Sequence, residues 1–251
     1  RGSLPVVVPA IGVLVLLVNL SAAGSLVFPG VAGTLWLLMA LGLNLAGHGR
    51  AIPLPRWSPL GMLAAFLGLA VACYATAYSP VVQAQAAIRL ADLEPAEAEV
   101  RLHRAARADP RCPEPWIRLS GLAFERWERS QQPEAFDQFE RYAEKAVLVA
   151  PKAAGIRWIT GERYAFAFAQ TGRGAYLSSA VASYQGAVEL YPNNALYRAS
   201  LAMALRLAGD EPGFQEQSGI ALWLDQVTPH DERKLPAELR KSLQRNSSGT
   251  N

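Results

Sequence analysis

The chain has 251 residues, enough for one or two ordinary domains, and its formal net charge of +3 is unevenly distributed. Residues 1–80 carry three basic side chains, Arg1, Arg50 and Arg56, and no Asp or Glu. The remaining 21 basic and 21 acidic side chains lie in residues 81–251, which are therefore neutral overall. This balance excludes a nucleic-acid footprint, which needs clustered basic residues, and the apolar first third excludes a single soluble domain.

Three apolar runs in the first third of the chain have the lengths of membrane-spanning helices. They cover residues 4–20, 26–47 and 59–78, and a hydrocarbon core of roughly 30 Å needs about 20 helical residues. The third run follows Ser58, a good helix cap, and opens with a proline, which suits the first helical turn. We therefore expect a transmembrane region surrounded by membrane lipid. Buried core helices are the alternative.

The positive-inside rule orients the three expected helices. Loop 48–57 is short and basic, whereas residues 21–25 are uncharged. Arg1 and loop 48–57 are therefore expected in the cytoplasm, so that residues 81–251 lie in the periplasm. The protein is then a multi-pass protein of the inner membrane. The chain starts without Met, which indicates a fragment or a processed chain.

A repeat is visible in the polar two thirds of the chain. Pro110, Pro151 and Pro192 recur at a constant interval of forty-one positions, and each follows an alanine five positions earlier: Ala105, Ala146 and Ala187. Two helices fit between successive prolines, and helix pairs at a fixed period indicate a solenoid. These residues resemble the tetratricopeptide repeat (TPR), in which a small residue lies at the helix crossing and Pro closes the second helix. The period is longer than the usual one of about 34 residues.

Together with the three apolar runs, this resemblance predicts an all-α fold, with about three transmembrane helices followed by a TPR-like α-solenoid. Repeats are expected over residues 94–226, after a helical connector at 81–93 that continues the third membrane helix. Residues 227–251 are expected to hold a capping helix, near 236–245, and a polar tail. The expected repeat helices are 95–108, 114–128, 134–149, 153–170, 175–190, 194–208 and 212–226.

The sequence contains no complete catalytic or metal-binding arrangement. His48, His103 and His230 have no partner at metal-ligand spacing, and Cys73 and Cys112 are poorly placed to pair. We therefore assign no catalytic residue, no metal ligand and no cofactor to this chain. Whether the parent protein is an enzyme stays open at this point.

Side chains on the first helices of the repeats are the candidate binding residues, because these helices line the concave face of a solenoid. Helical offset selects Phe124, Glu125, Trp158, Glu162, Met203 and Arg206. Such a face commonly binds extended peptides, which predicts a protein or peptide partner in the groove. The alternative is that the aromatic members only pack between repeats.

Residues 16–47 resemble the last helices of the bacterial O-antigen ligase and polymerase family. The shared features are an apolar helix, a short hinge, a Pro-containing entry at Pro29 and a Leu/Trp-rich closing helix. The resemblance implies the C-terminal part of a membrane glycosyltransferase. Its upstream catalytic region would act on a lipid-linked glycan, and its TPR domain would bind an acceptor or a partner protein. The alternative is a non-enzymatic, membrane-anchored TPR scaffold of a cell-envelope complex.

Overall fold

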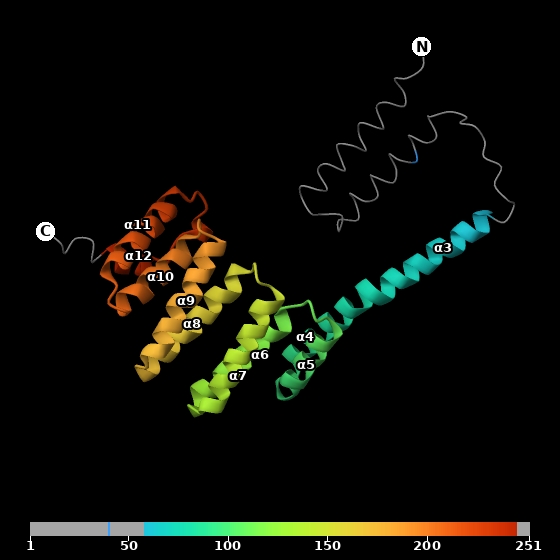
Figure 1. Ribbon diagram of the computed structural model, residues 1–251, viewed down its shortest axis with the longest axis horizontal. Helices are drawn as coiled ribbons and strands as arrows, with labels where there is room; N and C mark the ends of the chain where they lie inside the picture. The colour runs from blue at the N-terminus through green and yellow to red at the C-terminus, as the bar shows by residue number, and fades with distance from the viewer. Residues whose placement is uncertain (1–39, 41–57, 245–251) are drawn as a thin grey trace, which may run out of the picture. The chain divides into compact units, whose positions relative to one another are not determined.

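The computed structural model describes residue 40 and residues 58–244, and the elements formed by these residues are all helical (Figure 1). The chain divides into two compact units, Arg1–Gly68 and Leu69–Asn251. The expected membrane helices 4–20 and 26–47 lie outside the described residues, apart from Ala40, which is helical.

The third apolar run forms helix α3 (Ser58–Cys73) and the π-helical turn η1 (Tyr74–Tyr78). Pro80 lacks an N–H and cannot bond to the carbonyl four residues earlier. In the turn before this proline, the N–H of Ser79 donates to the carbonyl of Tyr74, five residues earlier, which is the π-helical pattern. The expected helix 59–78 is therefore helical throughout, with a π turn over its last five residues. Among the described residues, no helix combines the length and the apolar character that a membrane crossing requires.

Four helix pairs follow within the described residues, and each helix packs mainly against its own partner. The pairs contact one another in chain order, and Figure 1 shows them from green to red. This is the arrangement of a TPR-like α-solenoid, so the expected all-α repeat fold is confirmed. The pairs are α4 (Ser79–Leu93) with α5 (Ala98–Ala108), α6 (Glu114–Ser130) with α7 (Pro133–Val149), α8 (Ala154–Thr171) with α9 (Gly174–Leu190), and α10 (Ala195–Leu207) with α11 (Glu211–Val227).

Buried positions recur with the period of the prolines along the second helices. The three alanines predicted at the helix crossings are at most 1% exposed: Ala105, Ala146 and Ala187. A second set with the same spacing is at most 7% exposed and extends into the fourth pair: Ala98, Phe139, Ala180 and Ala221. Most of these residues are small, so the backbones of the two helices in a pair can approach closely. The same small residues recur in successive pairs, so each pair can pack in a similar way.

The prolines predicted to close the second helices lie directly after the helix ends. Asp109, Ala150 and Tyr191 are the last residues before them, with φ angles of −128°, −130° and −140°. Each donates its N–H to the carbonyl four residues earlier, at 3.0–3.1 Å. A residue before proline is biased away from α conformation, so these helices end at the same register position.

Residues 81–93, expected as a helical connector, are helical and belong to α4, which also forms the first helix of the first pair. Ala84, Ala87, Ile88 and Ala91 are buried in a cluster with residues of α5. Their spacing of three and four residues forms one face of a helix. The short turn η2 (Pro95–Glu97) links α4 to α5.

The C-terminal end of the stack is covered by α12 (Ala237–Gln244), which follows the short turn η3 (Asp231–Arg233). Leu235 and Leu243 are at most 4% exposed and pack with residues of α10 and α11. Leu243 is also equivalent in repeat position to three buried residues of the first helices, because the same interval separates Ser120, Gly161, Ala202 and Leu243. This helix therefore occupies the place of a further first helix.

Candidate peptide-binding groove

Four of the six residues predicted to face a groove lie together between α6 and α8. They line a cavity of about 480 Å³ and are Phe124, Glu125, Trp158 and Glu162. The apolar part of this cavity also includes Ile159 and Phe166 from α8. Sequence reasoning missed these two side chains, although Phe166 occupies the register position that Glu125 has in the preceding repeat.

A second cavity of about 410 Å³ lies along α4, α5 and α6. It shares Gly121, Glu125 and Arg163 with the cavity between α6 and α8. Because the same three residues border both cavities, the two lie next to each other along the first helices α4, α6 and α8. We call the two cavities together the first-helix groove.

Phe124 lies mainly in the core beneath this groove. Its side chain is only 8% exposed. Its ring packs edge-to-face on Phe139 with centroids 5.3 Å apart, and on Phe166 with centroids 5.8 Å apart. Packing against α7 and α8 therefore accounts for most of this residue's surface, although Phe124 also borders the cavity.

Trp158 and Glu162 belong to a hydrogen-bonded network that links three helices. The indole N–H of Trp158 donates to Ser200 Oγ (3.0 Å), and the Ser200 hydroxyl donates to Glu162 Oε1 (3.1 Å). The Tyr184 hydroxyl donates to the same oxygen (2.7 Å). Burial, followed by the bond to Glu162, raises the pKa of Tyr184 far above its usual value. The Trp158 ring also stacks on Tyr197 with centroids 5.9 Å apart, so both groove residues are held in place.

Glu125 and Glu128 are exposed carboxylates on the α6 side of the groove. Among the described residues, only their backbone carbonyls accept hydrogen bonds, from Arg129 and Gln131. Neither side chain forms an ion pair within the part of the chain that the structure describes. Both carboxylates are therefore available to a ligand.

Arg163 contributes a half-buried positive charge to the same groove. Its Nη1 donates to Ser120 Oγ at 2.6 Å, and its guanidinium carbon lies 6.0 Å from the centre of the Phe124 ring. Burial lowers the pKa of Arg163, while the nearby Glu125 charge opposes this shift. Arginine nevertheless stays charged at neutral pH. No carboxylate of the described residues lies within ion-pair distance of it. The sequence signal that could have pointed to Arg163 is Gly121, where a small residue allows close approach.

Met203 and Arg206, the other two predicted groove residues, lie under α12 instead. Arg206 donates from Nη1 to the carbonyl of Ser242 (3.3 Å), and its guanidinium lies 5.1 Å from the Phe214 ring centre. Its Nη2 is 3.2 Å from the sulfur of Met203. These two side chains hold the C-terminal helix and do not border the first-helix groove.

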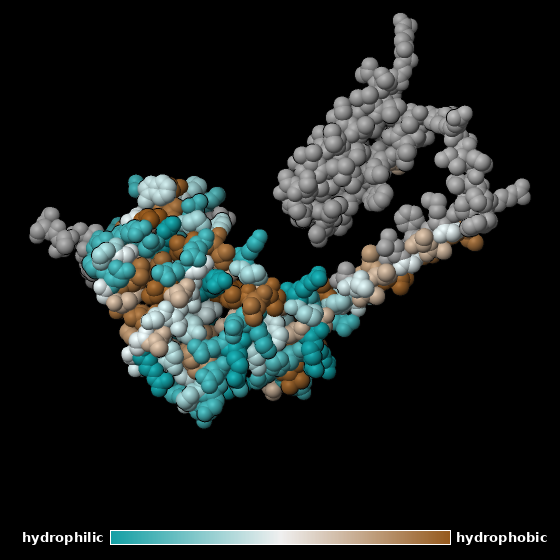
Figure 2. All heavy atoms as spheres, in the orientation of Figure 1, coloured by the Kyte–Doolittle hydropathy of each residue, from teal (hydrophilic) through white to brown (hydrophobic). Residues whose placement is uncertain are grey.

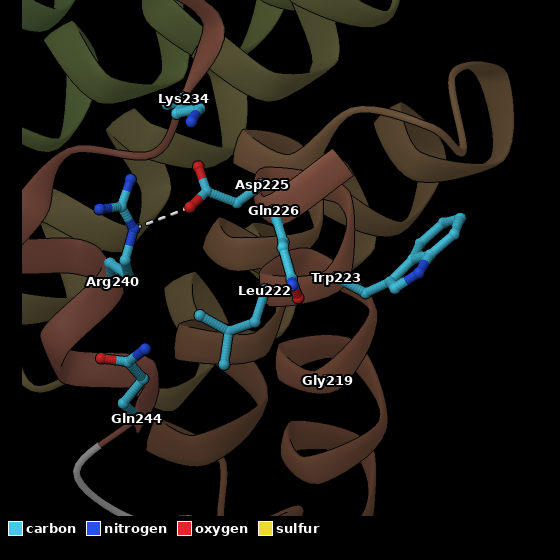
Figure 3. A pocket seen from close by; sticks show the side chains of 8 residues that line it. All are labelled: Gly219, Leu222, Trp223, Asp225, Gln226, Lys234, Arg240 and Gln244. Atoms are coloured by element: carbon cyan, nitrogen blue, oxygen red, sulfur yellow. Dashed lines mark hydrogen bonds and ion pairs between the residues drawn. The ribbon is translucent and has the colours of Figure 1, made fainter. Parts of the chain in front are cut away.

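A separate cavity of about 550 Å³ lies between α11 and α12 (Figure 3). Asp225 is 6% exposed and accepts hydrogen bonds from the N–H of Leu235 (2.6 Å) and from Nε of Arg240 (2.7 Å). Burial alone would raise the pKa of Asp225, but these two hydrogen bonds and the positive charges of Arg240 and Lys234 together outweigh burial and lower the pKa. In Figure 3 the Trp223 side chain points away from this pair. The charged groups here fasten α12 to α11.

The remaining sequence candidates do not gather into a reactive site. His103 Nε2 lies 3.2 Å from the Tyr142 hydroxyl, and His230 lies 3.8 Å from Glu232. Across residues 58–244, no three His, Cys, Asp or Glu side chains are arranged to hold a metal ion.

The solved structures that align with the chain include the following two. A double mutant titled MamA RS-1 ArsTM aligns with a TM-score of 0.46 and 18% identity, over 65% of this chain and 84% of that one. TTC0263, a thermophilic TPR protein of Thermus thermophilus, aligns with a TM-score of 0.45 and 19% identity, over 74% of this chain and 95% of that one. No protein-family model and no curated protein matches the chain. The resemblance to O-antigen ligases therefore finds no support there, and the TPR-like assignment depends on the helix pairs and their register.

Proposed function

We propose that the helical repeats form a protein-interaction scaffold that holds an extended segment of a partner protein in the first-helix groove. The observation that carries this proposal is that two cavities lie next to each other and share Gly121, Glu125 and Arg163 in their lining. A groove that passes three helices suits a ligand that extends across them, and stacked repeats present such extended surfaces.

The groove offers apolar area that a bound segment would cover. Phe166 is 37% exposed, and Ile159 and Trp158 are partly exposed. Removing apolar surface from water contributes roughly 25 cal/mol per Å² before the costs of association. Because the network around Glu162 already fixes Trp158, little side-chain ordering is needed when a ligand binds.

Selection from a displayed library of random dodecapeptides tests this function. The full chain, purified in a mild detergent, is the bait, and the affinities of the selected peptides are then measured for two variants. Ile159→Asn changes the groove, whereas Leu148→Asn makes the same change on α7, where Leu148 is 71% exposed. The proposal expects at least a tenfold loss of affinity for Ile159→Asn and none for Leu148→Asn. Selected peptides that bind both variants equally well, or a library that yields no binder, would contradict it.

The apolar first third supports a second part of the proposal, attachment of the scaffold to the inner membrane with the repeats in the periplasm. Residues 1–80 contain no acidic side chain. Leu60, Leu67 and Val71 of α3 are 72%, 59% and 67% exposed, and in Figure 2 this helix is largely white to brown. A lipid environment would cover these side chains. A parent protein with glycan-ligase activity is a further hypothesis, and it rests on residues 16–47 alone.

Membrane attachment is tested by alkaline carbonate extraction of cells that produce the chain. The proposal expects the chain to stay in the pellet, and protease added to spheroplasts to remove the repeats. Release into the supernatant would contradict attachment. Protection from protease in intact spheroplasts, followed by cleavage after lysis, would instead place the repeats in the cytoplasm.

A further inference from the structure

The part of the first-helix groove between α6 and α8 carries more negative than positive charge. Three carboxylates border it, those of Glu125, Glu128 and Glu162, against the single guanidinium of Arg163. The same cavity contains the apolar side chains Ile159 and Phe166. A ligand that complements this surface combines positive charge with apolar side chains.

We propose that the first-helix groove selects a cationic partner segment, in which Arg or Lys side chains alternate with apolar ones along an extended backbone. The proposal rests on the scaffold function above and names the chemistry of the segment that the scaffold takes. A segment rich in Asp or Glu is the competing occupant, and the experiment below includes it.

Glu125 and Glu128 are the main determinants of this selectivity. They are three residues apart on α6, so they share one face of the helix. Neither carboxylate forms an ion pair or a side-chain hydrogen bond within the described residues, although the Arg163 charge lies near Glu125, so a ligand cation does not have to displace an existing ion pair. Exposed ion pairs contribute little individually, but carboxylates grouped along a cleft raise the local concentration of cations.

Glu162 adds a third acceptor in a fixed position. The hydroxyls of Tyr184 and Ser200 both donate to its Oε1. The second oxygen, Oε2, accepts no hydrogen bond from these two groups, and the residue borders the same cavity as the α6 carboxylates. Because two donors hold this carboxylate, its charge stays at one place in the groove.

Arg163 has a different part in the same site. A β-carbon at Gly121 would lie 3.1 Å from Arg163 Nη2, so the glycine leaves room for the guanidinium beside α6. The Ser120 hydroxyl accepts from Nη1, which leaves the other N–H groups for acceptors in the groove. An extended peptide offers one carbonyl per residue, so Arg163 binds the main chain of the ligand while the carboxylates bind its side chains.

Two nonapeptides of opposite charge test the inference on the full chain. The probes are dye-labelled (Arg-Pro-Leu)₃ and (Glu-Pro-Leu)₃, in which proline keeps the backbone extended. Fluorescence polarisation measures their affinities for the wild type and for the double variant Glu125→Gln/Glu128→Gln. A matched double variant, Glu144→Gln/Glu189→Gln, removes two exposed carboxylates from the second helices α7 and α9.

The inference expects the arginine peptide to bind and the glutamate peptide to bind at least tenfold more weakly. It also expects Glu125→Gln/Glu128→Gln to weaken the binding of the arginine peptide about five- to tenfold. Salt at 0.5 M should largely remove this difference in affinity, because exposed charges are screened. The control pair should leave this affinity unchanged. Equal affinities for the two peptides, no measurable binding of the arginine peptide, or equal effects of the two double variants would overturn the inference.

The two proposals fail in distinguishable ways. If library peptides depend on Ile159 while the glutamate-to-glutamine change in the groove has no effect, the scaffold function stands and the cationic selectivity is wrong. If neither Ile159→Asn nor Glu125→Gln/Glu128→Gln changes the affinity for any peptide, both proposals are wrong.

Discussion

The ring of Tyr184 on α9 lies directly over Gly161 on α8. A β-carbon at Gly161 would be 2.7 Å from the ring carbons Cδ1 and Cε1, closer than packed side chains allow. The tyrosine ring therefore occupies the space that the missing side chain leaves at the crossing of α8 and α9. Its hydroxyl reaches Glu162 (2.7 Å), so the packing of one repeat also orients a groove carboxylate.

Gly161→Ala should destabilise the repeats, because either the ring or the helix must move to admit the methyl group. Overpacking of this kind costs about 1–3 kcal/mol in the free energy of unfolding. Gly219→Ala on α11 is the matched control, since a β-carbon there meets no atom within 4 Å. Better helix propensity should leave this control unchanged or up to about 1 kcal/mol more stable. Urea unfolding followed by circular dichroism measures both, and equal stabilities would refute the packing account.

Tyr184→Phe should change how stability depends on high pH. Burial, together with the bond to Glu162, raises the pKa of Tyr184, so the folded protein keeps a proton that the unfolded chain releases above its ordinary value of 10.0. This contribution is complete below pH 10 and decreases as the pH rises further. Thermal unfolding between pH 9 and pH 11 should therefore show a shallower decline for Tyr184→Phe than for the wild type. Equal slopes for Tyr184→Phe and the wild type would contradict this prediction.

Asp225→Asn should loosen α12. The substitution removes a carboxylate that accepts hydrogen bonds from Arg240 and from the Leu235 N–H, and such charged bonds contribute about 1.5–3 kcal/mol each. Since the folded state lowers the pKa of Asp225, its stabilisation is present above the ordinary value of 3.8 and is lost as the pH falls through the lowered pKa. Unfolding measured from pH 6 to pH 2 should show this loss in the wild type only.

Asp231→Asn is the control for the C-terminal helix. The Asp231 side chain is 96% exposed and pairs only with Lys234 at 3.5 Å among the described residues. The variant should unfold like the wild type at neutral pH. If Asp225→Asn also behaved like the wild type, the Asp225–Arg240 pair would not be what fastens α12.

Gly121→Ala should weaken ligand binding while the fold is kept. The new β-carbon would meet Arg163 Nη2 at 3.1 Å, and this is the end of a flexible side chain that can shift by a few tenths of an ångström. We expect a three- to tenfold loss of affinity for (Arg-Pro-Leu)₃ with little change in melting temperature. An unchanged affinity would show that the position of Arg163 does not matter for binding.

The regular part of the repeats was predictable from the sequence because its positions have strict physical requirements. The alanines at the crossings must be small, and proline cannot continue a helix, so both recur at fixed spacing. The fourth pair, whose two helices are also among those expected, departs from the pattern. Its proline, Pro229, follows Pro192 at a shorter interval than the earlier prolines, and Asp225 stands where the earlier copies have Leu102, Ala143 and Tyr184.

The role of α4 and part of the groove were not predicted. The buried face of α4 consists mainly of alanines, and the preceding apolar run hid its periodicity, although residues 84, 87, 88 and 91 follow a helical pattern. Helical offset found four groove residues, but it could not show that α12 covers Met203 and Arg206. It also could not show that Arg163 borders the groove, because that depends on the packing of α8 against Gly121 on α6.

Hydrogen–deuterium exchange of the full chain tests the central claim most directly, that a ligand lies along the first helices. Exchange is measured with and without a selected dodecapeptide at saturating concentration. The account predicts slower exchange in α6 and α8, with no change in the second helices α7 and α9. Protection confined to α7 and α9, or none in α6 and α8 at saturation, would contradict it.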